Sequence, residues 1–141
     1  VIGYIYTHCP DICPLTTNNM RIIQNKLKEQ GINDGVQFIS ISFDPNRDSP
    51  SVLKNYARVR NLDLANWTLL TGNESKVKEV LKSDGVIAAV SDSSKKTGSY
   101  YIAHTDRISL MDRDGRIRVH YQGSQAPVDK VVKDIKSLLN Q

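Results

Sequence analysis

Two cysteines, Cys9 and Cys13, are the side chains of this 141-residue chain whose type and spacing best suit chemistry. An apolar run over residues 1–6 precedes them, and Pro14 is typical of a helix start. Both sulfurs are therefore expected at the carboxyl end of a buried strand and beside a helix N-terminus, where ligands bind in open α/β sheets. Unpaired N–H groups and the helix dipole favour thiolates there, and a thiolate is both a nucleophile and a metal ligand.

The spacing of the two cysteines leaves several interpretations open. As a structural pair they would be small buried hydrophobes or a disulfide, and a disulfide that closes so short a loop adds little stability. The common redox motif has two residues between its cysteines, whereas three stand between Cys9 and Cys13. On a helix this spacing puts both sulfurs on one face, which permits a disulfide and also presents two soft donors to one metal. A closed zinc site would need two further ligands.

Three histidines, His8, His104 and His120, could supply a nitrogen ligand. His8 adjoins Cys9, so on an extended backbone its side chain points the other way, and we expect it to pack or hydrogen-bond within the core. His120 alternates with its strand neighbours and is expected to be a half-exposed strand residue. His104 follows a serine-rich loop, and nothing in its spacing brings it to Cys9, so a core histidine is the default interpretation.

Strand-like and helix-like segments alternate along the chain. Strands are predicted over residues 1–6, 36–43, 67–70, 86–90, 100–112 and 116–121. Helices are predicted over residues 15–30, from Pro50 onward, over 74–82 and over 128–139. Residues 91–99 are typical of a polar loop, and Gly115 supplies a positive φ for a hairpin turn after Asp112. This order predicts an α/β domain with a central sheet and helices on both faces.

A cluster of charged residues, Asp44, Arg47 and Asp48, precedes the helix expected from residue 50 onward. Either Asp48 or Ser49 is expected to cap that helix, and Arg47 is expected to pair with Asp44. The functional alternative for this cluster is a charged rim that orients a metal ligand. Asp11, between the cysteines, presents the same choice between capping a helix start and contacting a partner.

The composition excludes several classes of protein. Hydrophobic residues make up 39% and charged residues 24%, which is unlike a collagen-like, disulfide-dense or disordered chain. The net charge is +4, but the lysines are interspersed with acidic residues, so we expect no nucleic-acid partner. No apolar run reaches the ~18 residues of a membrane span. The first residue is Val1 rather than Met, so we expect the chain to be part of a longer protein.

Three motifs resemble those of one family. Tyr6-Thr7-His8-Cys9-Pro10-Asp11-Ile12-Cys13-Pro14 resembles the signature of the Sco/SenC proteins, which are copper-binding, thioredoxin-like assembly factors for cytochrome c oxidase. Asp44-Pro45-Asn46-Arg47-Asp48-Ser49-Pro50 resembles the second motif of that family, and His104-Thr105, followed by a strand and Asp112-Arg113-Asp114-Gly115-Arg116, resembles its third. The resemblance covers nearly the whole chain. It implies a thioredoxin-like α/β fold, with a central mixed sheet flanked by helices on both faces. It also implies a single domain over residues 1–141, without the strands and the membrane anchor that normally precede this domain in the family.

The resemblance also implies that Cys9, Cys13 and His104 together bind one copper ion. Two thiolates and one imidazole suit Cu(I), and the same set accommodates Cu(II). Three protein ligands leave the ion open to exchange with a partner, as a carrier requires. A mobile loop that carried His104 would let the third ligand arrive or leave, which is a hypothesis from sequence position.

Two functions are implied. The first is a copper metallochaperone that delivers copper to the dinuclear copper centre of an oxidase subunit. The second is a thiol–disulfide oxidoreductase, in which Cys9 and Cys13 reduce the copper-ligand cysteines of that subunit. Metal binding requires His104, whereas disulfide exchange needs only the two cysteines. A peroxidase has less support, because no upstream threonine pairs with a lone reactive cysteine, and a redox or copper sensor stays open.

The implied partners are subunit II of the oxidase, another copper chaperone and a thiol reductant that keeps the cysteines reduced. Family members work outside the cytoplasm. The expected location is therefore the periplasm, the outer face of the plasma membrane or the mitochondrial intermembrane space, with the full-length protein anchored to a membrane.

Overall fold

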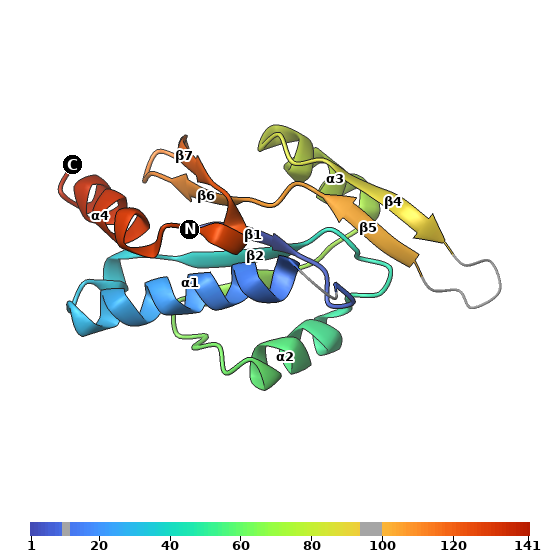
Figure 1. Ribbon diagram of the computed structural model, residues 1–141, viewed down its shortest axis with the longest axis horizontal. Helices are drawn as coiled ribbons and strands as arrows, with labels where there is room; N and C mark the ends of the chain where they lie inside the picture. Colours follow the sequence, from blue (N-terminus) through green and yellow to red (C-terminus); the bar gives the residue numbers. More distant parts are fainter. Residues whose placement is uncertain (10–11, 94–99) are drawn as a thin grey trace.

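The structure is a computed structural model that describes residues 1–9, 12–93 and 100–141. Within these residues a five-stranded mixed sheet forms the centre of the molecule, with the strand order β3-β2-β1-β6-β7 (Figure 1). The parallel strands are β1 (Ile2–Ile5), β2 (Phe38–Ser42) and β3 (Trp67–Leu70). β6 (Ile108–Met111) runs antiparallel to β1, and β7 (Ile117–Tyr121) runs antiparallel to β6. β1 is central and buried at every position, as its apolar run predicts.

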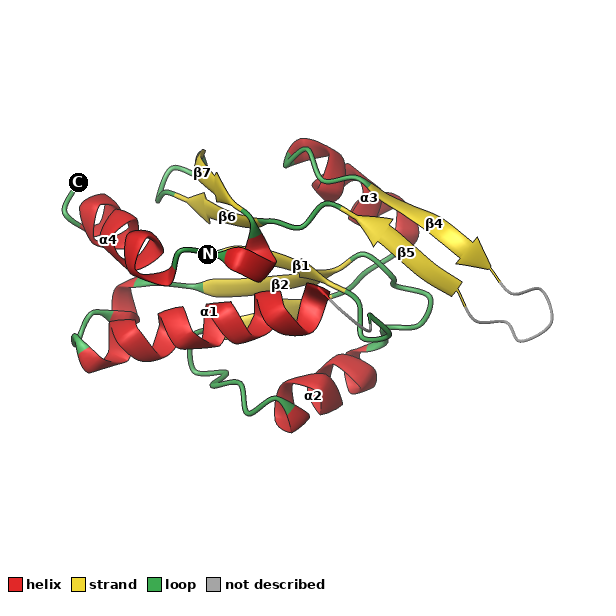
Figure 2. Cartoon of the chain, viewed as in Figure 1, coloured by secondary structure: helices red, strands yellow, loops and turns green. Residues whose placement is uncertain are grey.

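Helices cover both faces of this sheet (Figure 2). In the described chain they are α1 (Ile12–Glu29), α2 (Pro50–Val59), α3 (Glu74–Ser83) and α4 (Val128–Leu139). Neighbouring residues of β1 show which helix covers which face, because side chains alternate along a strand. A Cβ at Gly3 would touch Met20 of α1, whereas the hydroxyl of Tyr4 donates to Asp84, which directly follows α3. α1 and α3 therefore lie on opposite faces.

The other two helices lie beside α1. α4 packs against α1, and a 2.8 Å hydrogen bond between the hydroxyls of Thr17 and Tyr56 joins α1 to α2. The apolar side chains buried on this face include Met20, Ile23, Leu27, Phe38, Val131 and Ile135. The predicted central mixed sheet with helices on both faces is confirmed.

Local sequence explains where the helices begin. Ser49 accepts a hydrogen bond from the N–H of Val52 at 3.3 Å, and Pro50 takes the first helical position, so Ser49 rather than Asp48 caps α2. α1 begins at Ile12, earlier than predicted, which leaves Pro14 within the first turn, where a missing N–H costs nothing. Among the described helices, none combines the length and the hydropathy of a membrane span.

One predicted strand is wrong. Residues 100–112 form two strands rather than one: β5 (Tyr100–His104) pairs with β4 (Ala88–Ser93), and β6 pairs with β1 in the central sheet. The chain changes sheets at Asp106, whose carboxylate accepts from the N–H of Ser124 at 2.9 Å and from the hydroxyl of Thr16 at 3.3 Å. An alternating pattern continues through such a change, so the sequence could not reveal it.

We refer to the antiparallel pair of β4 and β5 as the β4–β5 ribbon. The predicted polar loop over residues 91–99 is only partly tested: residues 91–93 belong to β4, which corrects that part, and residues 94–99 lie outside the described chain. The hairpin turn between β6 and β7 is confirmed, with Gly115 at φ 77°.

Candidate metal centre

The two cysteines lie where the end of β1 meets the start of α1. The N–H of Cys9 donates to the carbonyl of Tyr6 at 3.2 Å in the turn that follows β1. Cys13 is the second residue of α1 and is buried, with 1% of its surface exposed, whereas Cys9 is half-buried. The N–H of Cys13 lies 3.4 Å from the sulfur of Cys9 and donates to it. The expected position beside a helix N-terminus is confirmed, and this donor favours a thiolate at Cys9.

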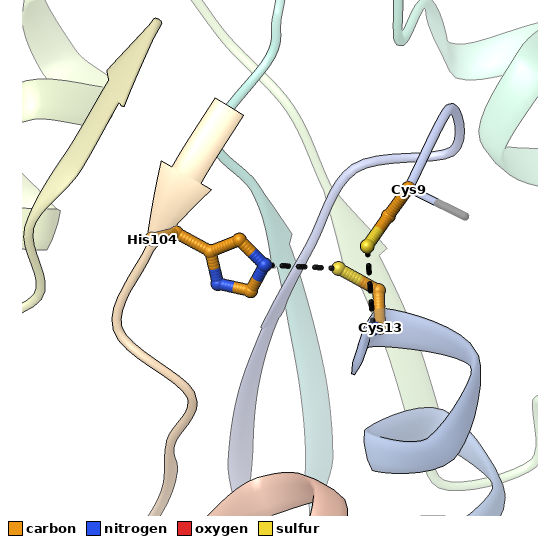
Figure 3. A group of neighbouring side chains, drawn as sticks. All are labelled: Cys9, Cys13 and His104. Atoms are coloured by element: carbon orange, nitrogen blue, oxygen red, sulfur yellow. Dashed lines mark hydrogen bonds between the residues drawn. The ribbon is translucent and has the colours of Figure 1, made fainter. Parts of the chain in front are cut away.

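His104, at the end of β5, lies at the same place although it is distant from both cysteines in the sequence (Figure 3). Its Nε2 lies 3.5 Å from Cys13 Sγ, and its Nδ1 lies 3.0 Å from the carbonyl oxygen of Thr105. An Nδ1 that donates to a carbonyl carries the proton, which leaves the lone pair of Nε2 toward the sulfurs. One ligand atom from each of Cys9, Cys13 and His104 lies within 4.8 Å of the other two. The structure thus brings together the three residues that the motifs predict as copper ligands.

Aromatic rings hold the imidazole of His104. The ring of Phe43, the first residue after β2, lies 4.5 Å from the imidazole between centroids, and Tyr6 meets it edge to face at 5.9 Å. The hydroxyl of Tyr6 also accepts from the N–H of Ile102 in β5 at 3.3 Å. The imidazole of His104 is therefore held by residues that directly follow β1 and β2.

The electrostatics link the three side chains. Hydrogen bonding to Cys9, together with burial, raises the pKa of the Cys13 thiol above its ordinary value. Burial alone would lower the pKa of His104, but hydrogen bonds to Cys9 and to the Thr105 carbonyl, and the charge of Asp106, raise it above its usual value. Both pKa shifts have hydrogen bonding to Cys9 among their causes, so the protonation of Cys13 and of His104 is linked to that sulfur.

The other two histidines lie elsewhere. His8 is exposed, which corrects the expectation that it packs within the core, and its ring lies within 4.8 Å of the carboxylates of Asp44 and Asp48. It belongs to a group of potential ligands different from the one at the cysteines. His120 lies on β7 with 44% of its side chain exposed and its Nδ1 3.0 Å from the hydroxyl of Ser109, as an ordinary strand residue would.

The charged cluster of Asp44, Arg47 and Asp48 forms hydrogen bonds and an ion pair within the protein. Arg47 pairs with Asp44 at 2.5 Å, as predicted. Asp48 is fully buried and accepts hydrogen bonds from the hydroxyl of Ser42 at 2.7 Å and from the N–H and hydroxyl of Thr7 at 3.1 and 2.5 Å. Asp48 therefore fixes the turn that leads into Cys9, which the capping interpretation missed. The choice made for Asp11 falls on a residue outside the described chain.

Sequence reasoning missed three residues around His104. Tyr6 and Phe43 contact its ring, and Asp106 ties the chain that follows it to α1. Tyr6 opens the cysteine motif, so its position carried a signal, whereas Phe43 resembles any buried strand residue. Asp106 lies in the polar run Thr105-Asp106-Arg107 directly after His104, which marks a break in the strand pattern.

Comparison with known proteins assigns this chain to a family. The family model described as SCO1/SenC matches residues 1–140. The chain belongs to the SCO1/SenC family. It is 36% identical over 137 residues to the SCO1 protein homolog of Bacillus subtilis, covering 95% of this chain and 67% of that protein. It is 35% identical to a SCO2-like protein of Rickettsia prowazekii, covering 86% of this chain and 57% of that protein. The chain thus spans 57% to 67% of the lengths of these two relatives.

Solved structures of the family share the fold. A SCO1/SenC family lipoprotein from Bacillus anthracis superposes with a TM-score of 0.82 at 29% identity, over 97% of this chain and 79% of that one. ScoI of Bradyrhizobium japonicum with copper bound gives 0.81 at 31% identity, over 97% and 82%. Yeast Sco1 gives 0.79 at 31% identity, over 96% and 82%. The predicted thioredoxin-like α/β fold is confirmed.

Proposed function

We propose that Cys9, Cys13 and His104 bind one copper ion, which the protein carries as cargo during the assembly of cytochrome c oxidase. The observation that carries this proposal is the convergence of two sulfurs and one imidazole nitrogen within 4.8 Å. Two soft thiolates and an imidazole match the preferences of Cu(I) and Cu(II). The 3.5 Å between Cys13 Sγ and His104 Nε2 suits two ligands of one ion, because bonds of about 2.0–2.3 Å place donor atoms roughly 3–4 Å apart.

Relatives support copper as the metal. The ScoI structures of Bradyrhizobium japonicum and Arabidopsis thaliana have copper bound, at 31% and 27% identity to this chain. A protein of Stutzerimonas stutzeri that is 30% identical is described as a putative copper-binding protein. Within the described residues the group contains three potential ligands, which is fewer than the four of a closed structural zinc site. An ion held by three ligands is open to attack by the ligands of a partner, and this favours delivery over storage.

The proposed partners follow from this role. The recipient is subunit II of the oxidase with its dinuclear copper centre, another copper chaperone supplies the ion, and a thiol reductant keeps Cys9 and Cys13 able to bind it. The proposed location is extracytoplasmic or the mitochondrial intermembrane space, at a membrane. In support, one relative is a lipoprotein of Bacillus anthracis, and the yeast relatives are described as mitochondrial.

The test of copper binding is the metal stoichiometry of the freshly reduced protein. We expect one copper per chain, with thiolate-to-copper absorption bands in the Cu(II) form. Replacing Cys9 or Cys13 should abolish tight binding, and His104→Ala should remove the bands and weaken the complex. His120→Ala is the matched control, since His120 lies on β7. A His104→Ala variant that holds both oxidation states as tightly as the parent would exclude His104 as a ligand.

A second candidate is reduction of disulfides in the same oxidase subunit. The two sulfurs lie within 4.8 Å, and Cys9 is the more accessible. A disulfide switch has been identified in BsSco, a member of the Sco family whose structure is 34% identical in sequence to this chain. In this reaction the Cys9 thiolate attacks a substrate disulfide, and the Cys13 thiolate then displaces the substrate as a dithiol, leaving Cys9–Cys13 oxidised until an external dithiol reduces it. Turnover of a peptide disulfide that is indifferent to His104→Ala would favour this role.

A further inference from the structure

The β4–β5 ribbon carries His104 but has no backbone pairing with the central sheet in the described part of the chain. Cys9 and Cys13 belong to the junction of β1 and α1, so no hydrogen-bonded ladder sets their distance from the imidazole. The short connection from His104 through Asp106 to β6 and the side-chain contacts of β5 do so. β5 begins at Tyr100 and ends at His104, and the contacts at these two ends decide where the imidazole lies.

Two adjacent residues at the end of β2 hold both ends of β5. Phe43 packs its ring against His104, with 4.5 Å between the centroids. Asp44, the next residue, accepts a 2.6 Å hydrogen bond from the hydroxyl of Tyr100. Phe43 and Asp44 therefore contact residues at opposite ends of β5.

Arg47 also contacts Tyr100, through both its backbone and its ring. Its Nε donates to Asp44 at 2.5 Å, its Nη1 donates to the backbone carbonyl of Tyr100 at 3.1 Å, and its guanidinium lies 3.6 Å from the centroid of the Tyr100 ring. Asp44 is 3% exposed and the Arg47 side chain 18% exposed. Charge-assisted bonds made by a planar guanidinium in a desolvated place fix geometry much better than exposed ion pairs do. We call Asp44, Arg47 and Tyr100 the ribbon clasp.

Tyr6 connects the clasp to the imidazole. Its ring meets His104 edge to face, the guanidinium of Arg47 lies 5.8 Å from its centroid, and its hydroxyl accepts from the N–H of Ile102 in the middle of β5. β5 is therefore held at its start by the ribbon clasp, at its middle by Tyr6 and at its end by Phe43.

We propose that Asp44, Arg47 and Tyr100 are positioning residues that hold the β4–β5 ribbon so that His104 stays within reach of a metal on Cys9 and Cys13. The inference rests on the proposed copper site and gives the second motif a role in it. Asp44 and Arg47 contact Tyr100, the first residue of β5, and none of the three is itself a proposed copper ligand. Replacing any of them should therefore change copper affinity by changing the position of the His104 imidazole. Loss of a residue that orients a ligand weakens metal binding by roughly tenfold or more.

Two conservative variants test the ribbon clasp. Tyr100→Phe keeps the ring over Arg47 and removes the bond to Asp44, whereas Arg47→Lys keeps the charge and removes the planar fork. We expect each to weaken copper binding roughly tenfold in a chelator competition and to shift the thiolate-to-copper band. The matched control is Tyr121→Phe, which removes an equivalent 2.6 Å bond to Asp134 between β7 and α4, and it should leave copper binding unchanged.

A double-mutant cycle separates positioning from general destabilisation. In a His104→Ala background, Tyr100→Phe and Arg47→Lys should cause no further loss of copper affinity, because the residue they act through is gone. An equal loss in both backgrounds overturns the inference, and so does unchanged affinity of both variants in the parent.

A measurement without copper keeps this inference distinct from the proposed function. In the metal-free protein, NMR should detect the contact between the rings of His104 and Phe43, and the contact should weaken in Tyr100→Phe and in Arg47→Lys but not in Tyr121→Phe. A contact that persists unchanged in both clasp variants overturns the role of the ribbon clasp even if copper binds as proposed. A parent that binds no copper overturns the proposed function while the ring contact still reports on the clasp.

Discussion

The backbone N–H of Cys13 donates to the sulfur of Cys9 across 3.4 Å. This N–H belongs to the first turn of α1, where helical geometry leaves it without a backbone acceptor. The same turn buries the sulfur of Cys13, while Cys9 stays half-buried. The two cysteines therefore differ in exposure and in hydrogen bonding, and Cys9 is the one whose thiolate form is favoured.

We predict that Cys9 reacts first with thiol reagents. In the reduced, metal-free protein at neutral pH, Cys9 should be alkylated at least roughly tenfold faster than Cys13, because a thiolate reacts and a buried thiol with a raised pKa does not. Peptide mapping by mass spectrometry after short exposure to iodoacetamide measures both rates in one sample. Equal rates in the folded protein would contradict the inequality, and equal rates in urea provide the control.

The buried carboxylate of Asp48 leads to a prediction about stability. Asp48→Ala removes the acceptor of one buried donor on Ser42 and of two partly buried donors on Thr7. The free energy of unfolding should fall by about 3 kcal/mol, because donors left without an acceptor in the folded state have given up their hydrogen bonds to water with no replacement. Urea denaturation measures this loss as a lower midpoint with an unchanged slope.

Asp129→Ala is the control for that measurement. Asp129 pairs with Lys26 at 2.6 Å on the surface, where its side chain is 88% exposed, so the free energy of unfolding should change by no more than about 0.5 kcal/mol. Similar losses in Asp48→Ala and Asp129→Ala would contradict the structural role assigned to Asp48.

The hairpin turn of the third motif gives a prediction about pH. Hydrogen bonds from the N–H groups of Arg116 and Asp114, together with Arg118, hold the pKa of Asp112 below its ordinary value. A lowered pKa in the folded state means that this carboxylate stabilises the fold above its unfolded value of 3.8, and that the contribution is lost as the pH falls through the folded pKa. The stability difference between the parent and Asp112→Asn should therefore be constant at neutral pH and shrink below about pH 4. Acid titration of urea midpoints measures it, with Asp114→Asn as the exposed neighbour for comparison.

Periodicity predicted most of the fold because the elements are locally encoded. α4 repeats its apolar residues at helical spacing, and α2 carries its own cap in Ser49. The break between β5 and β6 was not predictable, since it depends on Asp106 meeting Ser124 and Thr16 from distant parts of the chain. The spacing of apolar residues within one segment carries no information about contacts between segments that are far apart in the sequence.

The candidate site divides in the same way. The position of Cys9 and Cys13 followed from a strand, a turn and a helix start that are neighbours in sequence. His104 lies 91 positions after Cys13, and spacing alone gave no reason to bring it there. Its approach depends on the path of the β4–β5 ribbon over Phe43 and Tyr6, so only the resemblance to a family predicted it.

The last prediction concerns the stability of the loaded protein. A metal that binds the native state and not the unfolded chain stabilises the fold by about 2.7 kcal/mol when its free concentration is a hundred times its dissociation constant. Buffered Cu(I) should therefore raise the melting temperature of the reduced protein by roughly 10 °C, and chelation should reverse the rise. His104→Ala should retain only part of the shift, because two ligands remain, and a variant with both Cys9→Ser and Cys13→Ser should show none. A full shift in that double variant would place the copper elsewhere, for example at His8, Asp44 and Asp48, the other group of potential ligands in the described chain.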